Sequence, residues 1–166
     1  GPLRGGKYSL FDGGSRVPLI VCWPAAVAPG TTSDALVCHV DLHASLARLT
    51  GQPLDADEAP DSLDVLDAFL GKSARGREDL IVEGMQGALA YRRGNWALIP
   101  PHGGPAVNVH TRTELGNAPD SQLYDLSADI GQHRNRAAEH PDLVKDMSIR
   151  MQAILRGTGQ RLADGG

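Results

Sequence analysis

The spacing of apolar residues changes near residue 75 of this 166-residue chain, and that change limits the folds open to it. Before residue 75, residues 17–23 form a continuous apolar run closed by Pro24, which is typical of a strand buried on both faces in a parallel sheet. After residue 75, short segments alternate apolar and polar residues, which is typical of antiparallel strands. The sequence therefore predicts an α/β (α+β) protein with two differently built parts.

The first part also carries a helix signal. Asp41 is expected to cap a helix in which Leu42, Leu46 and Leu49 recur at i, i+4 and i+7. Gly51 lies just past the end of that helix, where a left-handed C-cap belongs. The strand, loop and helix would complete a larger α/β sheet.

The second part is predicted to be a small antiparallel sheet with one helix. Strand signals occur at 80–82, 89–93, 96–99 and 123–126, and a Gly94-Asn95 turn joins the second and third. A long polar loop covers residues 100–119. Pro141 suits a first helical position, and Gly157 would close a helix with the apolar stripe Leu143, Met147, Met151, Ile154 and Leu155.

Composition and charge argue against several classes of protein. Net charge is −4 without long runs of one sign, so a nucleic-acid partner is not expected. No apolar stretch approaches the roughly 18 residues that span a bilayer, and residues 1–4 do not read as a signal peptide. Cys22 and Cys38 offer no disulfide framework, and their apolar neighbours predict buried free thiols.

Three short motifs lie close together at the start of the chain: Gly5-Gly6-Lys7, Asp12-Gly13-Gly14 and Arg16-Val17-Pro18. In this order they resemble a segment of the sulfatase family, although glutamate is commoner there than Asp12. In that family the segment follows an acidic pair that binds the active-site calcium, and a formylglycine nucleophile lies far upstream. The resemblance implies a C-terminal fragment of an arylsulfatase-like enzyme of the alkaline-phosphatase superfamily.

A second match lies near the other end of the chain. Leu123-Tyr124-Asp125-Leu126, followed by Asp129, Asn135 and His140-Pro141, is similar to the C-terminal subdomain of sulfatases. Ile130 stands where proline is usual, and Arg136 where leucine is usual. The resemblance implies that residues 1–75 are the end of an alkaline-phosphatase-like α/β domain. Residues 76–166 would be a small subdomain with about four antiparallel strands and a C-terminal helix.

Lys7 is the candidate catalytic and substrate-binding residue. A compact ammonium on a glycine-flanked backbone can approach a sulfate oxygen and offset its charge, although a lysine in such a loop is more often plain solvated surface. Gly13 and Gly14 are expected to supply unusual backbone angles at the turn. Arg16 is expected to pair with a carboxylate or to cap a loop carbonyl.

The histidines give weaker signals. His102 and His110 lie in the long polar loop, where a sulfatase's C-terminal region can approach substrate, so both are candidate substrate-binding residues; an exposed loop histidine more often has no specific role. His39 and His43 have i, i+4 spacing but no evident third ligand, so a metal site is not expected in this chain.

The segment from Cys22 to Ala26 partly matches the sulfatase nucleophile motif C-x-P-x-R. Ala26 occupies the arginine position, and a cysteine inside a buried strand could not be converted and attack. We therefore interpret Cys22 as a core thiol.

The resemblance implies that a longer parent protein hydrolyses sulfate esters, either of a small molecule or of a sulfated glycan, with calcium and formylglycine. The fragment itself would need no cofactor and would be inactive. The parent would be periplasmic or secreted if it behaves like typical bacterial sulfatases. Alternatives are a phosphonate or phosphodiester hydrolase of the same superfamily, and a non-catalytic module for substrate contact or for homo-oligomerisation through an exposed sheet edge or a former domain interface.

Overall fold

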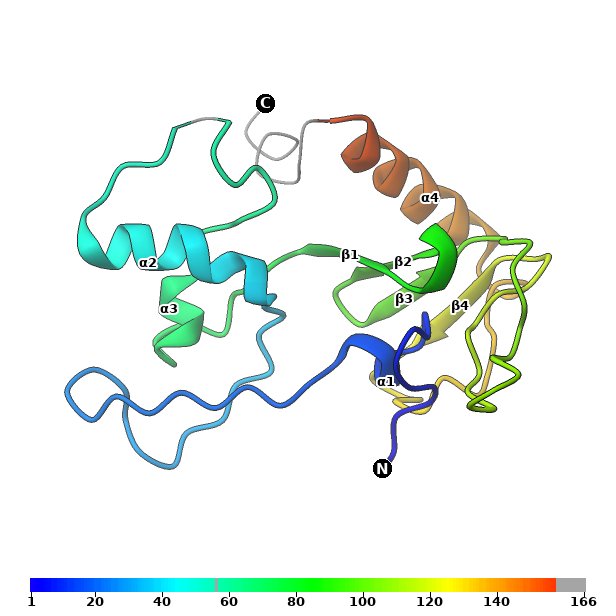
Figure 1. Ribbon diagram of the computed structural model, residues 1–166, viewed down its shortest axis with the longest axis horizontal. Helices are drawn as coiled ribbons and strands as arrows, with labels where there is room; N and C mark the ends of the chain where they lie inside the picture. Colours follow the sequence, from blue (N-terminus) through cyan, green and yellow to red (C-terminus); the bar gives the residue numbers. More distant parts are fainter. Residues whose placement is uncertain (56, 158–166) are drawn as a thin grey trace. The chain divides into compact units, whose positions relative to one another are not determined.

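The computed structural model describes residues 1–55 and 57–157, which form two compact units (Figure 1). The first unit contains Gly1–Pro18 and Asp79–Met151, and the second contains Leu19–Glu78 together with the described residues from Gln152 onward. The helical elements are α1 (Asp12–Ser15), η1 (His39–Asp41), α2 (Leu42–Thr50), α3 (Leu66–Phe69), η2 (Met85–Gly87) and α4 (Pro141–Arg156). The strands are β1 (Asp79–Glu83), β2 (Leu89–Arg93), β3 (Trp96–Ile99) and β4 (Gln122–Asp125).

The first unit is built on an antiparallel sheet with the strand order β1-β2-β3-β4, which confirms the predicted sheet of about four strands. Tyr91 lies opposite Leu98, and Leu98 lies opposite Leu123, so these three side chains share one face. The Gly94-Asn95 turn joins β2 to β3, and Gly94 has a φ of 55°, which a two-residue hairpin turn requires.

The N-terminal segment covers one face of this sheet. Leu10 and Phe11 are buried and form a core cluster with the side chains of that face: Ala88, Ala90, Ala97, Ile99, Tyr124 and Leu126. The Phe11 and Tyr124 rings meet edge to face with centroids 5.9 Å apart. Burial of these apolar side chains fixes residues 10 and 11 against the sheet.

Helix α4 covers the opposite face of the sheet, as Figure 1 shows in orange. Its Arg150 lies 3.0 Å from the Asp79 carboxylate, which also accepts a hydrogen bond from the Tyr91 hydroxyl. Burial, together with that hydrogen bond, raises the pKa of Tyr91. Met147 and Met151 are buried, as the apolar stripe predicts, whereas Leu155 is 45% exposed.

The second unit confirms the predicted helix but not the predicted cap. Helix α2 ends at Gly51, whose φ of 68° is the expected left-handed C-cap. The Asp41 side chain makes no capping hydrogen bond to α2, because Asp41 already has helical angles at the end of η1; it instead accepts from the Cys38 N–H in a capping box of η1. Its carboxylate also lies fully buried against Arg77. The face with Leu42, Leu46 and Leu49 is exposed.

The predicted buried strand at 17–23 is wrong. The structure has no strand there, and Val17 and Ile20 are 78% and 88% exposed. A strand buried on both faces requires neighbouring strands and covering layers, and no described segment pairs with this run. For the same reason Cys22 is exposed, and Cys38 is only half-buried; both are free, but neither is the buried thiol that we predict from the sequence.

The two compact units do not test the predicted domain boundary at residue 75. Gly1–Pro18 groups with the sheet, whereas the division at residue 75 concerns domains of a longer protein and stays a prediction. Residues 158–166 of the predicted subdomain lie outside the described residues. Among the helices of the described ranges, none combines the length and the apolar character that a membrane crossing requires.

Candidate functional site

Lys7 is the second residue of a tight turn. The turn is closed by a hydrogen bond from the Ser9 N–H to the Gly6 carbonyl, with an N to O distance of 2.9 Å. Tyr8, the third residue of the turn, has a φ of 77°, whereas Lys7 does not have a positive φ; this is the pattern of a type II turn. Glycine or asparagine normally occupies that third position, so a tyrosine there costs about 1–3 kcal/mol of backbone strain.

The residues after the turn are fixed in the core of the first unit. Leu10 and Phe11 are 4% and 2% exposed. The Leu10 N–H donates to the Leu115 carbonyl at 2.9 Å, and the Phe11 N–H donates to Ser9 Oγ at 3.2 Å. The strained angle at Tyr8 is therefore held by packing and hydrogen bonds on its C-terminal side.

A bidentate ion pair holds the N-terminal side of the turn. Arg4 donates from Nε and Nη2 to the two carboxylate oxygens of Glu114, at 2.9 and 2.7 Å. The Arg4 guanidinium also lies 4.1 Å from the centroid of the Phe11 ring and donates to the Gln132 carbonyl. The hydrogen bond from Arg4 holds the pKa of Glu114 below its ordinary value.

Two glycines of α1 allow the backbone to fold closely against this turn. A Cβ at Gly13 would lie 2.4 Å from the Arg4 carbonyl oxygen, and one at Gly14 would lie 2.1 Å from that of Ser9. Neither glycine has a positive φ, so the prediction of unusual angles is wrong, and close approach is the reason for glycine here. Arg16 pairs with the Asp12 carboxylate at 3.5 Å, as expected.

The turn presents Lys7 as an unpaired cation. Its side chain is exposed, and its Nζ lies 5.1 Å from the centroid of the Tyr8 ring. Within the described part of the chain, Lys7 forms no ion pair with a carboxylate. A small anion could therefore reach the ammonium group without displacing a protein partner.

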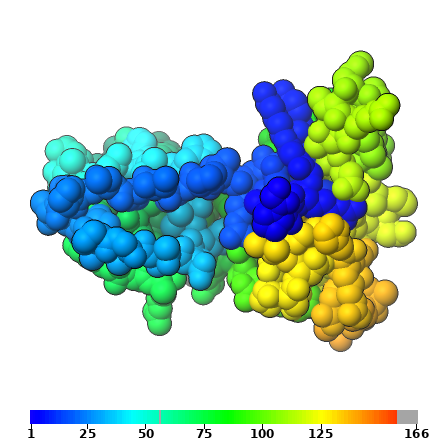
Figure 2. Space-filling model, turned by 90° about the horizontal axis from the view of Figure 1, so that it is seen from below, coloured from blue at the N-terminus to red at the C-terminus, as the bar shows by residue number. Residues whose placement is uncertain are grey.

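The long loop at 100–119 lies beside this turn, and Figure 2 shows its yellow-green atoms next to the dark-blue N-terminal residues. A Cβ at Gly6 would touch the Thr113 methyl group at 3.4 Å, which places Thr113 against the residue before Lys7. His110 is exposed near Thr113, and its backbone N–H donates to Asn108 Oδ1 at 3.0 Å. The loop thus brings His110 to a segment that contacts the turn.

His102 has a different environment. It is half-buried, and its Nδ1 accepts a hydrogen bond from the Gly104 N–H at 3.1 Å. No contact in the described structure joins His102 to Lys7. Its role in substrate binding stays a prediction, as does that of His110.

Sequence reasoning missed three residues that shape the turn: Arg4, Tyr8 and Glu114. The pairing of Arg4 with Glu114 spans 110 positions and has no local signal in one sequence. The positive φ of Tyr8 could be inferred only indirectly from the sequence, because Gly-Gly-Lys before a buried segment favours a tight turn.

The described residues hold no group of three histidine, cysteine, aspartate or glutamate side chains that could bind a metal ion. His43 instead lies 3.4 Å from the Glu58 carboxylate. Calcium takes six to eight oxygen ligands, and the described residues do not bring together three such side chains from which that shell could be built.

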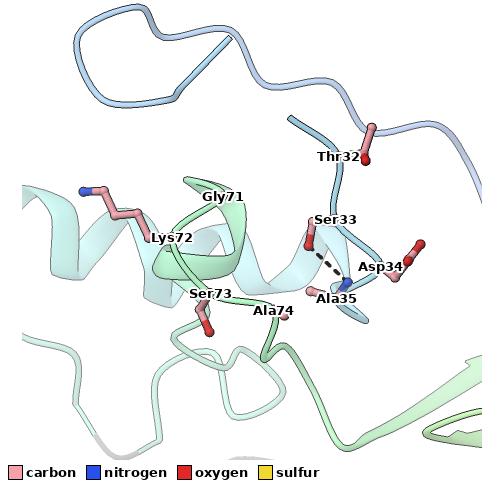
Figure 3. A pocket seen from close by; sticks show the side chains of 8 residues that line it. All are labelled: Thr32, Ser33, Asp34, Ala35, Gly71, Lys72, Ser73 and Ala74. Atoms are coloured by element: carbon pink, nitrogen blue, oxygen red, sulfur yellow. Dashed lines mark hydrogen bonds between the residues drawn. The ribbon is translucent and has the colours of Figure 1, made fainter. Parts of the chain in front are cut away.

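The second unit has a shallow, open hollow of about 410 Å³, lined by residues 32–35 and 71–74 (Figure 3). Ser33 Oγ accepts a hydrogen bond from the Ala35 N–H inside it. Lys72 and Asp34 are its charged lining residues, and Figure 3 shows the Lys72 side chain directed away from Ser33. With no converging polar groups, the hollow is a weaker candidate than the Lys7 turn.

Comparison with known proteins agrees with the motifs. A scan against models of protein families finds none that matches. The N-acetylgalactosamine-6-O-sulfatase of Bacteroides thetaiotaomicron is 43% identical over 93% of this chain and 30% of the relative. Human arylsulfatase A is 32% identical over 81% of this chain and 29% of the relative.

Structural comparison gives the same result. A solved structure from work on the metabolism of multiple glycosaminoglycans by Bacteroides thetaiotaomicron matches with a TM-score of 0.88 and 43% identity. The match covers 91% of this chain and 31% of that one. The chain thus spans about 30% of the length of the first of these relatives. On the basis of these matches, the chain belongs to the sulfatase family.

Proposed function

We propose that this chain is the C-terminal part of an arylsulfatase-like enzyme that hydrolyses sulfate esters, and that Lys7 binds the sulfate group. The observation that carries the proposal is the 43% identity, over 93% of this chain, to a protein named as a sulfatase. The Lys7 turn supports it independently, because it presents an unpaired cation on a backbone fixed from both sides.

The chemistry of Lys7 suits a sulfate ester. An ammonium group is a compact point charge that can contact one sulfate oxygen closely. Negative charge develops on the leaving-group oxygen as the S–O bond breaks, and a positioned cation stabilises that charge. A turn held by the core and by the Arg4–Glu114 pair requires little reorganisation during the reaction.

The calcium and formylglycine that the family implies would come from other residues of the parent protein. When bound, calcium would supply positive charge to the sulfate oxygens, and formylglycine would supply the nucleophile. The described residues do not offer a metal site, and the motif at Cys22 lacks its arginine because residue 26 is alanine. The contribution of this chain is therefore binding and orientation.

The substrate class is proposed from the relatives. One is named for an N-acetylgalactosamine 6-O-sulfate and another for aryl sulfates. The higher identity to the first favours a sulfated amino sugar, free or within a glycan, as the substrate of the parent protein. The exposed His110, on the loop next to the turn, would contact the sugar rather than the sulfate.

The exposed apolar residues of the second unit support a longer parent protein. Leu19 and Ile20 are 55% and 88% exposed, and Leu46 of α2 is 50% exposed. Such surface usually packs against other protein. We assign this role to the rest of the parent protein rather than to a second copy of the chain. Light scattering of the parent protein tests this, because a homo-oligomer that depends on Ile20 would favour the second copy.

The reaction class is tested by purifying the parent protein and comparing two substrates, an aryl sulfate and an aryl phosphate diester. We expect kcat/KM for the aryl sulfate to be at least about 100-fold higher than for the aryl phosphate diester, because the site would be built for a sulfate monoester. Release of sulfate from N-acetylgalactosamine 6-sulfate would support the sugar substrate. Preference for the diester would identify a phosphodiester hydrolase, and no turnover of either would favour a non-catalytic module.

A further inference from the structure

We infer that Tyr8 is a positioning residue for Lys7, and that its ring holds the ammonium group in the orientation that binds sulfate. The inference rests on the proposed role of Lys7. The sequence motifs assign no role to Tyr8. Three observations carry it: a ring contact, a backbone angle and a fixed carbonyl.

The ring contact joins the two side chains directly. Lys7 Nζ lies 5.1 Å from the centroid of the Tyr8 ring, which is within the range of a cation–π interaction. The Tyr8 side chain is not part of the core, because Tyr8 is 51% exposed. Its ring therefore contributes little to packing. The group that lies over the face of the ring is the Lys7 ammonium group.

The backbone angle shows that a tyrosine is an unfavourable choice at this position. Its φ of 77° lies in the left-handed region, where a residue with a Cβ is strained and glycine is not. Strained backbone angles persist where the surrounding structure fixes them, and they concentrate at functional sites. Since the half-exposed ring has no large packing role, its contact with Lys7 accounts for the presence of tyrosine.

The Tyr8 carbonyl is fixed by a neighbouring segment. It accepts a hydrogen bond from the Met85 N–H at 3.0 Å. A Cβ on Gly84 would lie 2.9 Å from the same carbonyl oxygen, so the glycine allows this close approach. The backbone that carries the ring is thus fixed, and the ring can restrict the flexible Lys7 side chain.

This arrangement predicts that sulfate meets an ammonium group that is already oriented. Lysine has a long, flexible side chain, and ordering it on binding costs affinity. A ring beneath the ammonium group removes part of that cost before the anion arrives. The ring should therefore affect sulfate affinity without contacting sulfate itself.

The test uses the parent protein with three substitutions at Tyr8 and inorganic sulfate as a competitive inhibitor. Tyr8→Phe keeps the ring, Tyr8→Leu keeps the strain without the ring, and Tyr8→Gly removes both. We expect Tyr8→Phe to stay within about 2-fold of wild type, and Tyr8→Leu and Tyr8→Gly to raise the sulfate inhibition constant about 2- to 5-fold. An unchanged inhibition constant for Tyr8→Leu would overturn the inference.

Thermal unfolding separates positioning from a structural role. Tyr8→Gly relieves the backbone strain, so its Tm should equal or exceed that of wild type while its sulfate affinity falls. A structural role would make both quantities fall together, which would contradict the inference.

A double-mutant cycle separates this inference from the proposed function. In a Lys7→Ala background, Tyr8→Leu should no longer change the inhibition constant, because the ring has nothing left to position. If Lys7→Ala weakens sulfate inhibition but Tyr8→Leu has the same effect in both backgrounds, the Tyr8 inference alone fails. If Lys7→Ala itself leaves sulfate inhibition unchanged, the proposed role of Lys7 fails and the inference fails with it.

Discussion

Asp41 and Arg77 form a fully buried ion pair in the second unit, although 36 positions separate them in the sequence. Arg77 Nε lies 2.8 Å from Asp41 Oδ2, and both side chains are 0% exposed. Asp41 also accepts hydrogen bonds from the N–H groups of Cys38 and Leu63, while Arg77 donates to the Asp61 carbonyl. The pair therefore ties together loop segments that no described strand connects.

Breaking this buried pair should destabilise the second unit. Asp41→Asn keeps the shape of the side chain but removes the buried negative charge that Arg77 Nε contacts, which we expect to cost about 3–5 kcal/mol. Urea unfolding of the chain measures this loss. The matched control is Asp67→Asn, which breaks an exposed pair with Arg48 (2.8 Å) and should cost far less, because solvent screens exposed charges. Equal losses of stability in the two variants would contradict the stabilising role of the buried Asp41–Arg77 pair.

A single methyl group at Gly14 should disturb the Lys7 turn. The Cβ of Gly14→Ala would lie 2.1 Å from the Ser9 carbonyl oxygen, so the backbone of the turn would have to shift. We expect a loss of about 1–3 kcal/mol, as for other overpacked sites. Gly103→Ala is the control, because its Cβ would meet no atom within 4 Å. Urea unfolding should therefore give a lower free energy of unfolding for Gly14→Ala than for Gly103→Ala. Similar values for the two variants would contradict the prediction and show that the turn tolerates the shift.

The Arg4–Glu114 pair should give stability that depends on pH. The pKa of Glu114 is lowered from its ordinary value of 4.5, first by the hydrogen bond from Arg4. A lowered carboxyl pKa stabilises the fold above pH 4.5, and this contribution is lost as pH falls through the lowered pKa. Because the Glu114 side chain is 49% exposed, the effect should be below about 1 kcal/mol.

The measurement compares wild type with Glu114→Gln in urea at neutral and at acidic pH. Wild type should be the more stable at about pH 7. The difference should shrink as pH falls below 4.5 and through the lowered pKa of Glu114, where the protonated carboxyl is uncharged like the glutamine. Glu83→Gln, at an exposed position at the end of β1, is the control and should show no such dependence. A stability difference that persists at acidic pH would mean that the pair does not act through the charge of Glu114.

The isolated chain should not hydrolyse an aryl sulfate, because the proposed nucleophile and calcium ligands belong to other parts of the parent protein. An assay of the purified 166-residue chain tests this directly. Its rate should equal that of the same chain with Lys7→Ala. Turnover above that of the variant would show that this chain contains a complete active site.

Local patterns predicted most elements of the first unit, because their signals lie within a few residues. The alternation in β2 and the Gly94-Asn95 turn specify a hairpin, and Pro141 specifies the start of α4. The prediction failed where the deciding partners are distant. Ile20 lacks neighbouring strands within the described residues, and Asp41 finds Arg77 rather than a helix N-terminus.

The candidate site was predicted only in part, for the same reason. The glycine-flanked motif marked Lys7 as a candidate, because the motif is local; its role stays a prediction. The ion pair that holds the turn joins Arg4 to Glu114 across 110 positions, and no pattern in one sequence indicates it. The glycines at 13 and 14 were recognised as special, but their reason is contact with distant backbone atoms rather than their own angles.

The central claim is that Lys7 binds the sulfate group of the substrate, and kcat/KM of the parent protein with Lys7→Ala tests it most directly. We predict a loss of about 100-fold or more with an unchanged Tm, because a charge-stabilising contact in the transition state is removed from an exposed side chain. Lys145→Ala, an exposed lysine of α4, should retain wild-type activity. Wild-type kcat/KM in the Lys7→Ala variant would contradict the claim.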